Sequence, residues 1–369
     1  MDMELTFEKH DLLHALQILQ SVASGRNTLP ILSNVLIQAT DGNIECVATD
    51  LEVGIKIKVE GAIQEDGAIT VSAKKLADIV KELPEDKTIH LVTTANDRVE
   101  ITCGDGVYKI IGLSDEEFPQ LPSVDGHSLT IDGETLRAVI RRTEFAAATE
   151  DVRYYLNGLY FSFLEDKTEV VATDMTRLAL AQCEPFETPE NVDGFIVPLK
   201  AVKEIERTFA ESDKVDISIL ENQILLADEK ATLTTRLVEG DYPKYQALIP
   251  ESATGRAVVS KEQFLQASRR VALLSNPKSY AICLEISTEQ IHLSTNTPEL
   301  GEAHETISVE SCNGRERIGL DARLLIETLS HIETESVAIE FTSAVTTVAF
   351  KPVGEEGHIC LIHPMRLGS

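Results

Sequence analysis

The feature that most constrains how this chain can fold is an internal repeat with a period of about 124 residues. Residues Val47–Asp50 recur unchanged as Val171–Asp174, and the opening segment Leu5–Glu8 recurs in altered form as Leu129–Asp132. A looser third opening lies at Val258–Lys261. Because an ordinary domain has roughly 100–150 residues, the 369 residues of the chain predict three similar domains.

Each copy divides again into two smaller units, each made of a short strand, a helix and antiparallel strands. The first helix illustrates the pattern, since Leu12, Leu16 and Leu19 recur at helical spacing and would form one apolar face. After each helix, alternating runs such as Thr88–Val92 predict strands. The six helices predicted in this way span residues 8–24, 74–83, 134–144, 200–211, 261–274 and 321–332.

The sequence therefore predicts an α+β fold in which three repeated domains each pack two helices on antiparallel sheets. The expected domains are residues 1–125, 126–250 and 251–369. Their boundaries fall at Pro119–Ser123 and Pro250–Ser252, two proline-containing stretches with the composition of linkers.

Composition excludes several classes of protein. No apolar run approaches the ~18–20 residues that cross a bilayer, and Met1–His10 lacks the apolar core of a signal peptide, so we expect a cytoplasmic protein without membrane contact. The six cysteines are scattered singly, without the spacing of a zinc site, so we expect reduced thiols, no metal and no cofactor. They are Cys46, Cys103, Cys183, Cys283, Cys312 and Cys360.

A net charge of −28, taken alone, argues against nucleic-acid binding, because phosphate contacts need Lys and Arg. The distribution of charge argues otherwise. The predicted helices hold 14 of 33 basic residues and 12 of 61 acids and so sum to +2, whereas the other 19 bases and 49 acids sum to −30. If the helices share one surface, that surface could hold DNA weakly while the rest repels it. Charge alone leaves open the alternative that Lys and Arg are simply common on solvated helix faces.

The first alternative to a DNA-binding protein is an enzyme. The repeated Asp50 and Asp174 could form a two-carboxylate site with one acid from each copy. That chemistry needs a tight Asp-Thr/Ser-Gly loop, whereas here Leu51-Glu52 and Met175-Thr176 follow the aspartates. No nucleophile elbow, P-loop, dinucleotide fingerprint or zinc-protease motif is present either. We therefore expect no catalytic activity and no catalytic residues.

A repeat scaffold that binds proteins but not DNA is the second alternative. Such a scaffold would not be retained on nicked circular DNA and released when the circle is cut.

Several motifs resemble those of one family, the bacterial sliding DNA clamp, which is the β subunit of DNA polymerase III. The most specific are Asp151–Gly158 (DVRYYLNG) and the terminal Pro364–Leu367 (PMRL), and Thr28–Asn34 and Leu273–Asn276 also match in order. The resemblance covers essentially the whole chain. It implies a non-enzymatic processivity factor with three similar domains, two copies of which join head to tail as a ring around duplex DNA, with helices lining the hole.

The resemblance also implies a pocket between the second and third domains that accepts a short apolar motif from the polymerase α subunit, the clamp loader δ subunit and repair proteins. Met175-Thr176 stands where a Gly-His pair is usual, Ala247 where Arg is common and His363 where Met is common, which leaves the motif preference open. Leu156, Leu178 and Ile362 could equally be ordinary core. The matching positions are Leu156, Thr173, Met175, Thr176, Arg177, Leu178, Pro243, Leu248, Thr347, Ile362, His363, Pro364, Met365 and Arg366.

Two further sets of residues follow from the resemblance. Sequence-independent contacts to double-stranded DNA are expected from Arg26, Lys74, Tyr154, Tyr155 and Lys200, although one of the two tyrosine rings is expected to pack on its own domain. Glu150 is left out because a carboxylate cannot donate to phosphate. The homodimer joint is expected to bring Tyr108 and Ile110, on an apolar edge strand, against Leu273 and Leu274 of the other copy.

Overall fold

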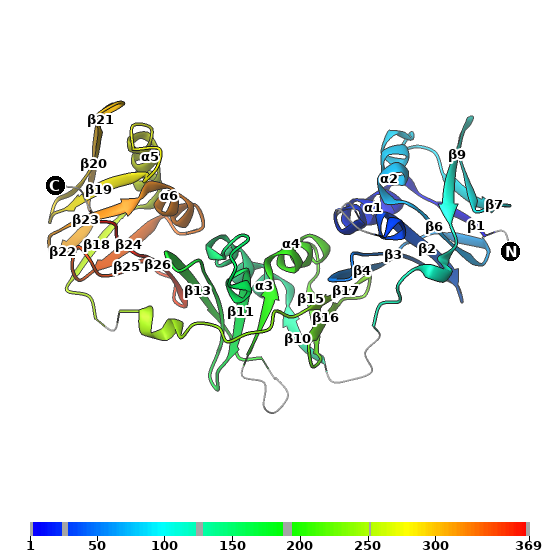
Figure 1. Ribbon diagram of the computed structural model, residues 1–369, viewed down its shortest axis with the longest axis horizontal. Helices are drawn as coiled ribbons and strands as arrows, with labels where there is room; N and C mark the ends of the chain where they lie inside the picture. Colours follow the sequence, from blue (N-terminus) through cyan, green and yellow to red (C-terminus); the bar gives the residue numbers. More distant parts are fainter. Residues whose placement is uncertain (1–2, 24–28, 123–127, 187–193, 251, 367–369) are drawn as a thin grey trace. The chain divides into compact units, whose positions relative to one another are not determined.

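The computed structural model describes residues 3–23, 29–122, 128–186, 194–250 and 252–366. Its contacts divide the chain into two compact units, each built from two stretches of sequence. Unit 1 comprises Met1–Glu134 and Lys200–Leu237, and unit 2 comprises Thr135–Leu199 and Val238–Ser369. Figure 1 labels the elements of both units.

Unit 1 contains a 13-stranded sheet in the order β10-β15-β16-β17-β4-β3-β2-β6-β9-β8-β7-β1-β5. All the pairings recorded in it are antiparallel. Its elements are β1 (Glu4–Phe7), α1 (Lys9–Ala23), η1 (Pro30–Ser33), β2 (Asn34–Thr40), β3 (Asn43–Thr49), β4 (Val53–Lys58), β5 (Ala62–Glu65), β6 (Gly67–Ser72), α2 (Ala73–Glu82), β7 (Ile89–Thr94), β8 (Arg98–Cys103), β9 (Gly106–Leu113), η2 (Asp115–Glu117), β10 (Ser128–Asp132), α4 (Leu199–Thr208), β15 (Lys214–Ile219), β16 (Gln223–Ala227) and β17 (Ala231–Arg236).

Helix α1 shows how the sequence pattern builds unit 1. Leu12, Leu16 and Leu19 are completely buried, and the helix packs on β3, on β4 and alongside α2. Helix α2 begins at a serine cap, since the Ser72 hydroxyl accepts a hydrogen bond from the Lys75 amide at 3.4 Å. Apolar residues at helical spacing therefore fix which face of each helix meets the sheet.

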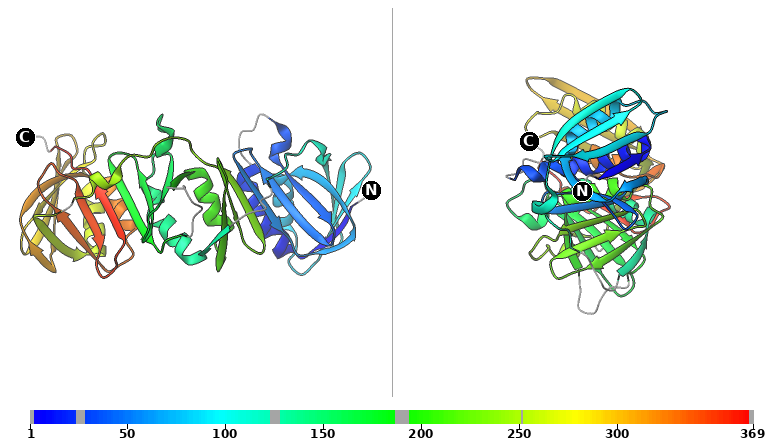
Figure 2. Two further views of the ribbon diagram at one scale, coloured as in Figure 1. Left: turned by 90° about the horizontal axis from the view of Figure 1, so that it is seen from below. Right: turned by 90° about the vertical axis from the view of Figure 1, so that its right-hand side faces the viewer.

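Unit 2 contains a nine-stranded sheet, β14-β11-β12-β13-β26-β25-β24-β18-β22, and a four-stranded sheet, β21-β20-β19-β23. Figure 2 gives two further views of the strands. Helix α3 (Gly133–Arg141) crosses the division between the units, and Leu199, the first residue of α4, also falls in unit 2. The other elements are η3 (Glu144–Ala146), η4 (Tyr154–Leu156), β11 (Gly158–Phe163), β12 (Thr168–Thr173), β13 (Arg177–Cys183), β14 (Gly194–Pro198), η5 (Tyr245–Leu248), β18 (Gly255–Ser260), α5 (Lys261–Ala272), β19 (Ala281–Ile286), β20 (Gln290–Thr297), β21 (Gly301–Ser308), β22 (Ser311–Asn313), β23 (Glu316–Asp321), α6 (Ala322–Ser330), β24 (Ser336–Phe341), β25 (Val348–Pro352) and β26 (His358–Ile362).

The six predicted helices are confirmed, and each begins and ends within three residues of its predicted limits. The α+β fold on antiparallel sheets is confirmed as well. The strand pairings also show a feature that the repeat did not predict. β17 pairs with β4 in unit 1 and β13 pairs with β26 in unit 2, so the two halves of the expected second domain join different neighbours.

Among the described residues, no helix is long and apolar enough to cross a membrane.

Candidate functional site

The turn that connects β12 to β13 is fixed by its own side chains. The Thr173 hydroxyl accepts a hydrogen bond from the Met175 amide at 3.0 Å and donates one to the Arg177 carbonyl at 2.6 Å. Asp174 Oδ1 accepts from the amides of Thr176 and Arg177 at 2.8 and 3.0 Å. This turn gives Met175 a φ of +73° and leaves its side chain 49% exposed. An apolar side chain is therefore held in solvent by a strained backbone, which marks the turn as a candidate contact surface.

Arg177 anchors this turn to helix α6. Its guanidinium donates to Asp174 Oδ2 at 3.1 Å and to Glu327 Oε2 at 2.5 Å, and it lies 5.4 Å from the centre of the Phe145 ring. Only 10% of the Arg177 side chain is exposed. Because its guanidinium is paired and its side chain is mostly buried, Arg177 has a fixed position and is not a mobile surface charge.

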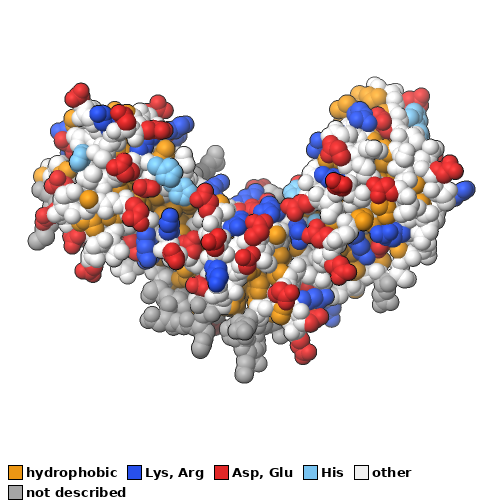
Figure 3. All heavy atoms as spheres, turned by 180° about the vertical axis from the view of Figure 1, so that it is seen from behind, with side chains coloured by type: hydrophobic (Ala, Val, Ile, Leu, Met, Phe, Trp, Pro, Cys, Tyr) orange, Lys and Arg blue, Asp and Glu red, His pale blue; other side chains and the backbone are white. Residues whose placement is uncertain are grey.

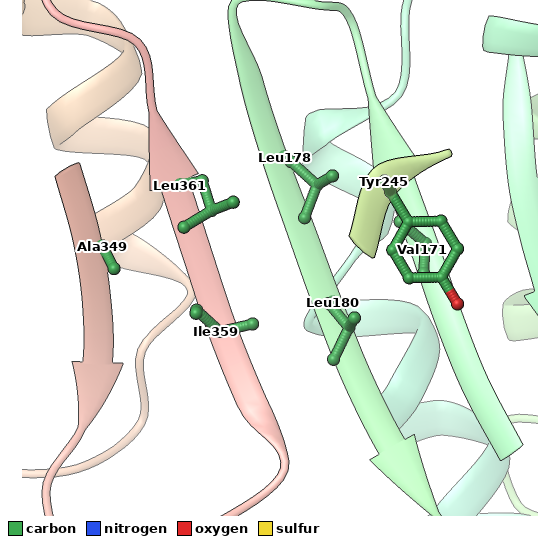
Figure 4. Close-up of a cluster of buried hydrophobic side chains, with 7 residues drawn as sticks. All are labelled: Val171, Leu178, Leu180, Tyr245, Ala349, Ile359 and Leu361. Carbon is green, nitrogen blue, oxygen red and sulfur yellow. The ribbon is translucent and has the colours of Figure 1, made fainter. Parts of the chain in front are cut away.

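A hollow lies beside the turn, between strand residues and the 3-10 helix η5. Leu178 of β13 pairs directly with Leu361 of β26, and both side chains reach the same face of the sheet, as Figure 4 shows. Leu248 of η5 is 42% exposed above this face. The residues that line the hollow are Thr173, Met175, Thr176, Arg177, Leu178, Leu248, Thr347, Leu361 and His363.

A buried apolar cluster lies beside the hollow and positions η5. Tyr245, which is 1% exposed, packs on Val171, Leu178 and Leu180, and its hydroxyl donates to Glu169 Oε2 at 2.6 Å. Burial, and then the hydrogen bond to the Glu169 carboxylate, raise the pKa of Tyr245 above its ordinary value. Because Tyr245 is anchored at both its ring and its hydroxyl, Leu248 three residues later is held over the hollow.

The structure brings eight of the fourteen predicted pocket residues to this lining, namely Thr173, Met175, Thr176, Arg177, Leu178, Leu248, Thr347 and His363. Leu156 and Ile362 are completely buried, which agrees with the core interpretation of these two. Pro364 is buried, Pro243 and Met365 are half-buried and Arg366 is exposed. Sequence reasoning missed Leu361, which the alternation of Ile359 and Leu361 on β26 could have indicated.

The residues predicted to contact DNA have varied surroundings. Lys74 is exposed on α2, and Tyr154 is 74% exposed next to a turn in which Asp151 Oδ1 accepts from the Arg153 amide at 2.8 Å. The Arg153 guanidinium and amide lower the pKa of Asp151 to about 2. Tyr155 is half-buried, and a Cβ added to Gly240 would lie 3.5 Å from its Cβ, so this ring packs locally while Tyr154 does not. Arg26 lies outside the described residues.

Lys200 is not a free cation in this structure. Its ammonium contacts the Asp50 carboxylate, of which only 4% is exposed, and lies 3.3 Å from Glu52 Oε2. Burial alone would lower the pKa of Lys200, but these carboxylates outweigh it and raise the pKa. A phosphate would have to compete with both carboxylates for Lys200. Figure 3 shows basic side chains lying among acidic ones over the face that it presents.

The predicted joint residues lie on apolar surface. Residues Gly106–Ile111 of β9 pair with β8 along one edge, and within the described residues β9 pairs with β6 only at Gly112 and Leu113. Tyr108 is 40% exposed and Ile110 is half-buried on this edge. In unit 2, Leu273 is 78% exposed at the end of α5, whereas Leu274 is half-buried. Val107 and Ile111 of the same strand are more exposed than Tyr108.

The two repeated aspartates each hold a turn and a cation. Asp50 Oδ1 accepts from the amides of Glu52 and Val53, as Asp174 does in its own turn. Their second oxygens contact Lys200 and Arg177 respectively. Both carboxylates thus have structural roles, which removes the observation on which the enzyme alternative depended.

Three models of DNA polymerase III beta subunit domains match the chain. The N-terminal domain matches residues 3–122, the central domain residues 130–244 and the C-terminal domain residues 246–366. The chain belongs to the DNA polymerase III beta subunit family, the beta sliding clamps. Members of this family are accessory processivity factors and not catalytic enzymes.

Individual beta sliding clamps are similar along their whole length. The chain is 32% identical to the beta sliding clamp of Pseudomonas aeruginosa over 369 residues, which is 99% of this chain and 100% of that protein. It is 31% identical to the Escherichia coli K12 beta sliding clamp, with the same coverage. The solved Pseudomonas aeruginosa sliding clamp bound to griselimycin has a TM-score of 0.94 at 32% identity, and the Bacillus subtilis clamp 0.93 at 27%, each with 100% of both chains covered.

The family assignment confirms the resemblance on which the site residues were predicted. Of the four residues expected to depart from the usual pattern of the family, Met175, Thr176 and His363 line the hollow, whereas Ala247 is exposed outside its lining. The His363 amide donates to the Thr176 carbonyl at 2.8 Å, so two of the three altered positions are linked through the backbone.

Proposed function

We propose that this clamp encircles duplex DNA as a head-to-tail homodimer in the cytoplasm and tethers partner proteins through the hollow beside Met175. The partners we expect are the polymerase α subunit, the clamp loader δ subunit and other proteins that carry a short apolar motif. The observation that carries this proposal is the hollow itself. It combines aliphatic walls, Leu178 and Leu361, with the exposed Met175 and Leu248 on a rigid scaffold.

The chemistry of the lining indicates an extended peptide with consecutive apolar side chains. Leucine and methionine walls accept several related side chains, because flexible apolar groups adapt their packing. Thr347 adds a hydroxyl group that can bond to a peptide amide or carbonyl, and Thr176 can still accept from a peptide amide, because its hydroxyl already donates to Asp174 Oδ1 at 2.6 Å.

Peptide binding tests the hollow directly. The probe is a fluorescein-labelled peptide with adjacent leucine and phenylalanine residues, and the readout is fluorescence anisotropy. Leu248→Asp should weaken binding at least 10-fold, or about 1.4 kcal/mol, because it places a carboxylate in an apolar contact. Leu164→Asp is the matched control, since Leu164 is 39% exposed elsewhere in unit 2. Equal affinities for the two variants would contradict the assignment of the pocket.

The dimer has its own support and its own test. The apolar edge of β9 and the exposed Leu273 are surfaces that a soluble protein ordinarily covers. We expect sedimentation equilibrium to give a dimer, and the double variant Leu273→Ala/Leu274→Ala to give a monomer at the same concentration. A wild-type chain that is monomeric across a dilution series would contradict the ring.

DNA encirclement is separated from a protein-only scaffold by topology. The clamp, loaded by a clamp loader onto a nicked circular plasmid, should be retained through gel filtration and lost once the plasmid is cut. A scaffold that binds peptides but is never retained on the circle would support the alternative function.

A further inference from the structure

Two histidines on the outer hairpin of the four-stranded sheet are arranged like neighbouring ligands of one metal ion. His292 of β20 and His304 of β21 are diagonal neighbours, since His292 pairs with Thr306 and His304 pairs with Ser294. Nε2 of His292 lies 3.3 Å from Nδ1 of His304. Their ring centres are 5.4 Å apart and their planes differ by 16°. The two nitrogens therefore face each other almost along the line between the rings.

This separation is the one that a tetrahedral metal imposes. Two nitrogens bound at about 2.0–2.1 Å with a tetrahedral angle between them are about 3.3–3.4 Å apart. In the metal-free protein the same gap is bridged by an N–H group of one ring donating to the other ring. A metal can replace that proton after the rings change tautomer, with no loss of protons from the pair.

The one bridging proton moves to the outer nitrogen of its own ring, and each outer nitrogen has an oxygen nearby. Nδ1 of His292 lies 3.1 Å from the Thr306 hydroxyl, and Nε2 of His304 lies 3.7 Å from Glu302 Oε2. Histidine ligands ordinarily donate their second N–H group to a carboxylate or another acceptor, which fixes the tautomer and the ring orientation. Thr306 is thus within hydrogen-bond distance of His292, and Glu302 is a more distant charged neighbour of His304, beside two inward-facing ligands.

We propose that His292 and His304 form a surface site for a divalent transition metal such as Zn²⁺, Ni²⁺ or Cu²⁺, the ions that imidazole ligands favour. Among the residues that the structure describes, no group of three or more His, Cys, Asp or Glu side chains is placed to hold a metal. Water would therefore complete the coordination, and the ion would exchange readily. Because β21 is the outermost strand of its sheet, a bound metal would fasten this edge strand to β20.

The chain contains a second histidine pair that serves as a matched control. His10 and His14 lie one turn apart on α1, with ring centres 6.5 Å apart. Nδ1 of His10 lies 3.3 Å from Asp11 Oδ1 rather than facing the other ring. Removing this pair deletes the same number of imidazoles without touching the β20–β21 hairpin.

Isothermal titration of the chelator-treated full chain with Zn²⁺ alone tests the site, with Co²⁺ absorption as a second probe. We expect one site per chain, at least 10-fold weaker in His292→Ala and in His304→Gln, and unchanged in the double variant His10→Ala/His14→Ala. Glu302→Gln should weaken binding by less, up to about 10-fold, because it alters only the outer acceptor. Circular dichroism would establish that each variant is folded. No binding by the wild type, or binding lost only in the His10/His14 variant, would overturn the proposal.

Discussion

The turns Thr49–Val53 in unit 1 and Thr173–Arg177 in unit 2 share one backbone and differ in what surrounds it. In each, the threonine hydroxyl accepts from the amide two residues on, and the aspartate accepts from the next two amides. Leu51 and Met175 have φ values of +75° and +73° and are 50% and 49% exposed. The repeat thus preserves the turn down to its strained residue.

The strand residue after each turn makes the difference. Leu178 forms an apolar wall, whereas unit 1 has Gly54 at this position, and a Cβ there would lie 2.3 Å from Leu121 Cδ2. Leu121 of the linker therefore sits directly on β4. In unit 2 the corresponding linker residue, Tyr245, packs beside Leu178 and leaves Leu248 exposed. The binding surface that we propose therefore lies at the second turn, where the next side chain and the linker leave room.

The largest expected effect comes from removing the wall at the second turn. Leu178→Ala deletes a side chain that is 2% exposed, so we expect the free energy of unfolding of unit 2 to fall by about 2–5 kcal/mol and peptide binding to be lost. Urea unfolding followed by hydrogen exchange of unit 2 measures the first effect and anisotropy the second. A loss of stability below about 1 kcal/mol would mean that Leu178 is not part of the core.

The next largest effect is a loss of stability at low pH, which we expect in unit 2 and not in unit 1. Burial, and then the charge of Arg142, lower the pKa of His358 to about 4, while Ala231 begins the corresponding strand in unit 1. The unfolded chain therefore binds a proton that the folded chain does not, and stability falls as the pH drops from about 6.5 towards 4. Between pH 7 and pH 5 unit 2 should lose about 2 kcal/mol. Hydrogen exchange at the two pH values measures this loss, which His358→Leu should abolish.

A larger side chain at Gly54 tests the same comparison in unit 1. Gly54→Leu should destabilise unit 1 by about 1–3 kcal/mol, because the new side chain meets Leu121 and Thr234. Adding Leu121→Ala should restore part of that loss, which a double-mutant cycle in thermal unfolding would quantify. Strictly additive effects of the two substitutions would contradict the direct contact.

The smallest effect on stability should come from the strained residues themselves. Leu51→Gly and Met175→Gly each relieve a positive φ but increase the freedom of the unfolded chain, so both should change stability by less than about 1 kcal/mol. Their binding effects should differ. Met175→Gly should weaken binding of the labelled peptide several-fold, and Leu51→Gly should leave the affinity unchanged, as measured by anisotropy.

Sequence patterns predicted the helices, and the repeat of Val47–Asp50 as Val171–Asp174 marked the two turns without predicting their geometry. Apolar residues such as Leu12 and Leu16 determine a helix face, and a Thr-Asp pair determines the turn through its own hydrogen bonds. The engagement of Lys200 by Asp50 was not predictable, because it joins residues that are far apart in sequence. The alternation on β26 could have indicated that Leu361 faces the same side as Ile359, but its pairing with Leu178 of β13 was not predictable, because the two residues are far apart in sequence.

The pairing of β13 with β26 also determines how the polypeptide could be divided. Unit 2 is built from two separate stretches of chain, joined by five residue pairs of this ladder and by the ion pair between Arg177 and Glu327. A cut in the exposed stretch Glu239–Asp241 would break the polypeptide without breaking those bonds. The two fragments, expressed together, should therefore copurify as a reconstituted clamp, which would allow each half to be labelled or altered on its own.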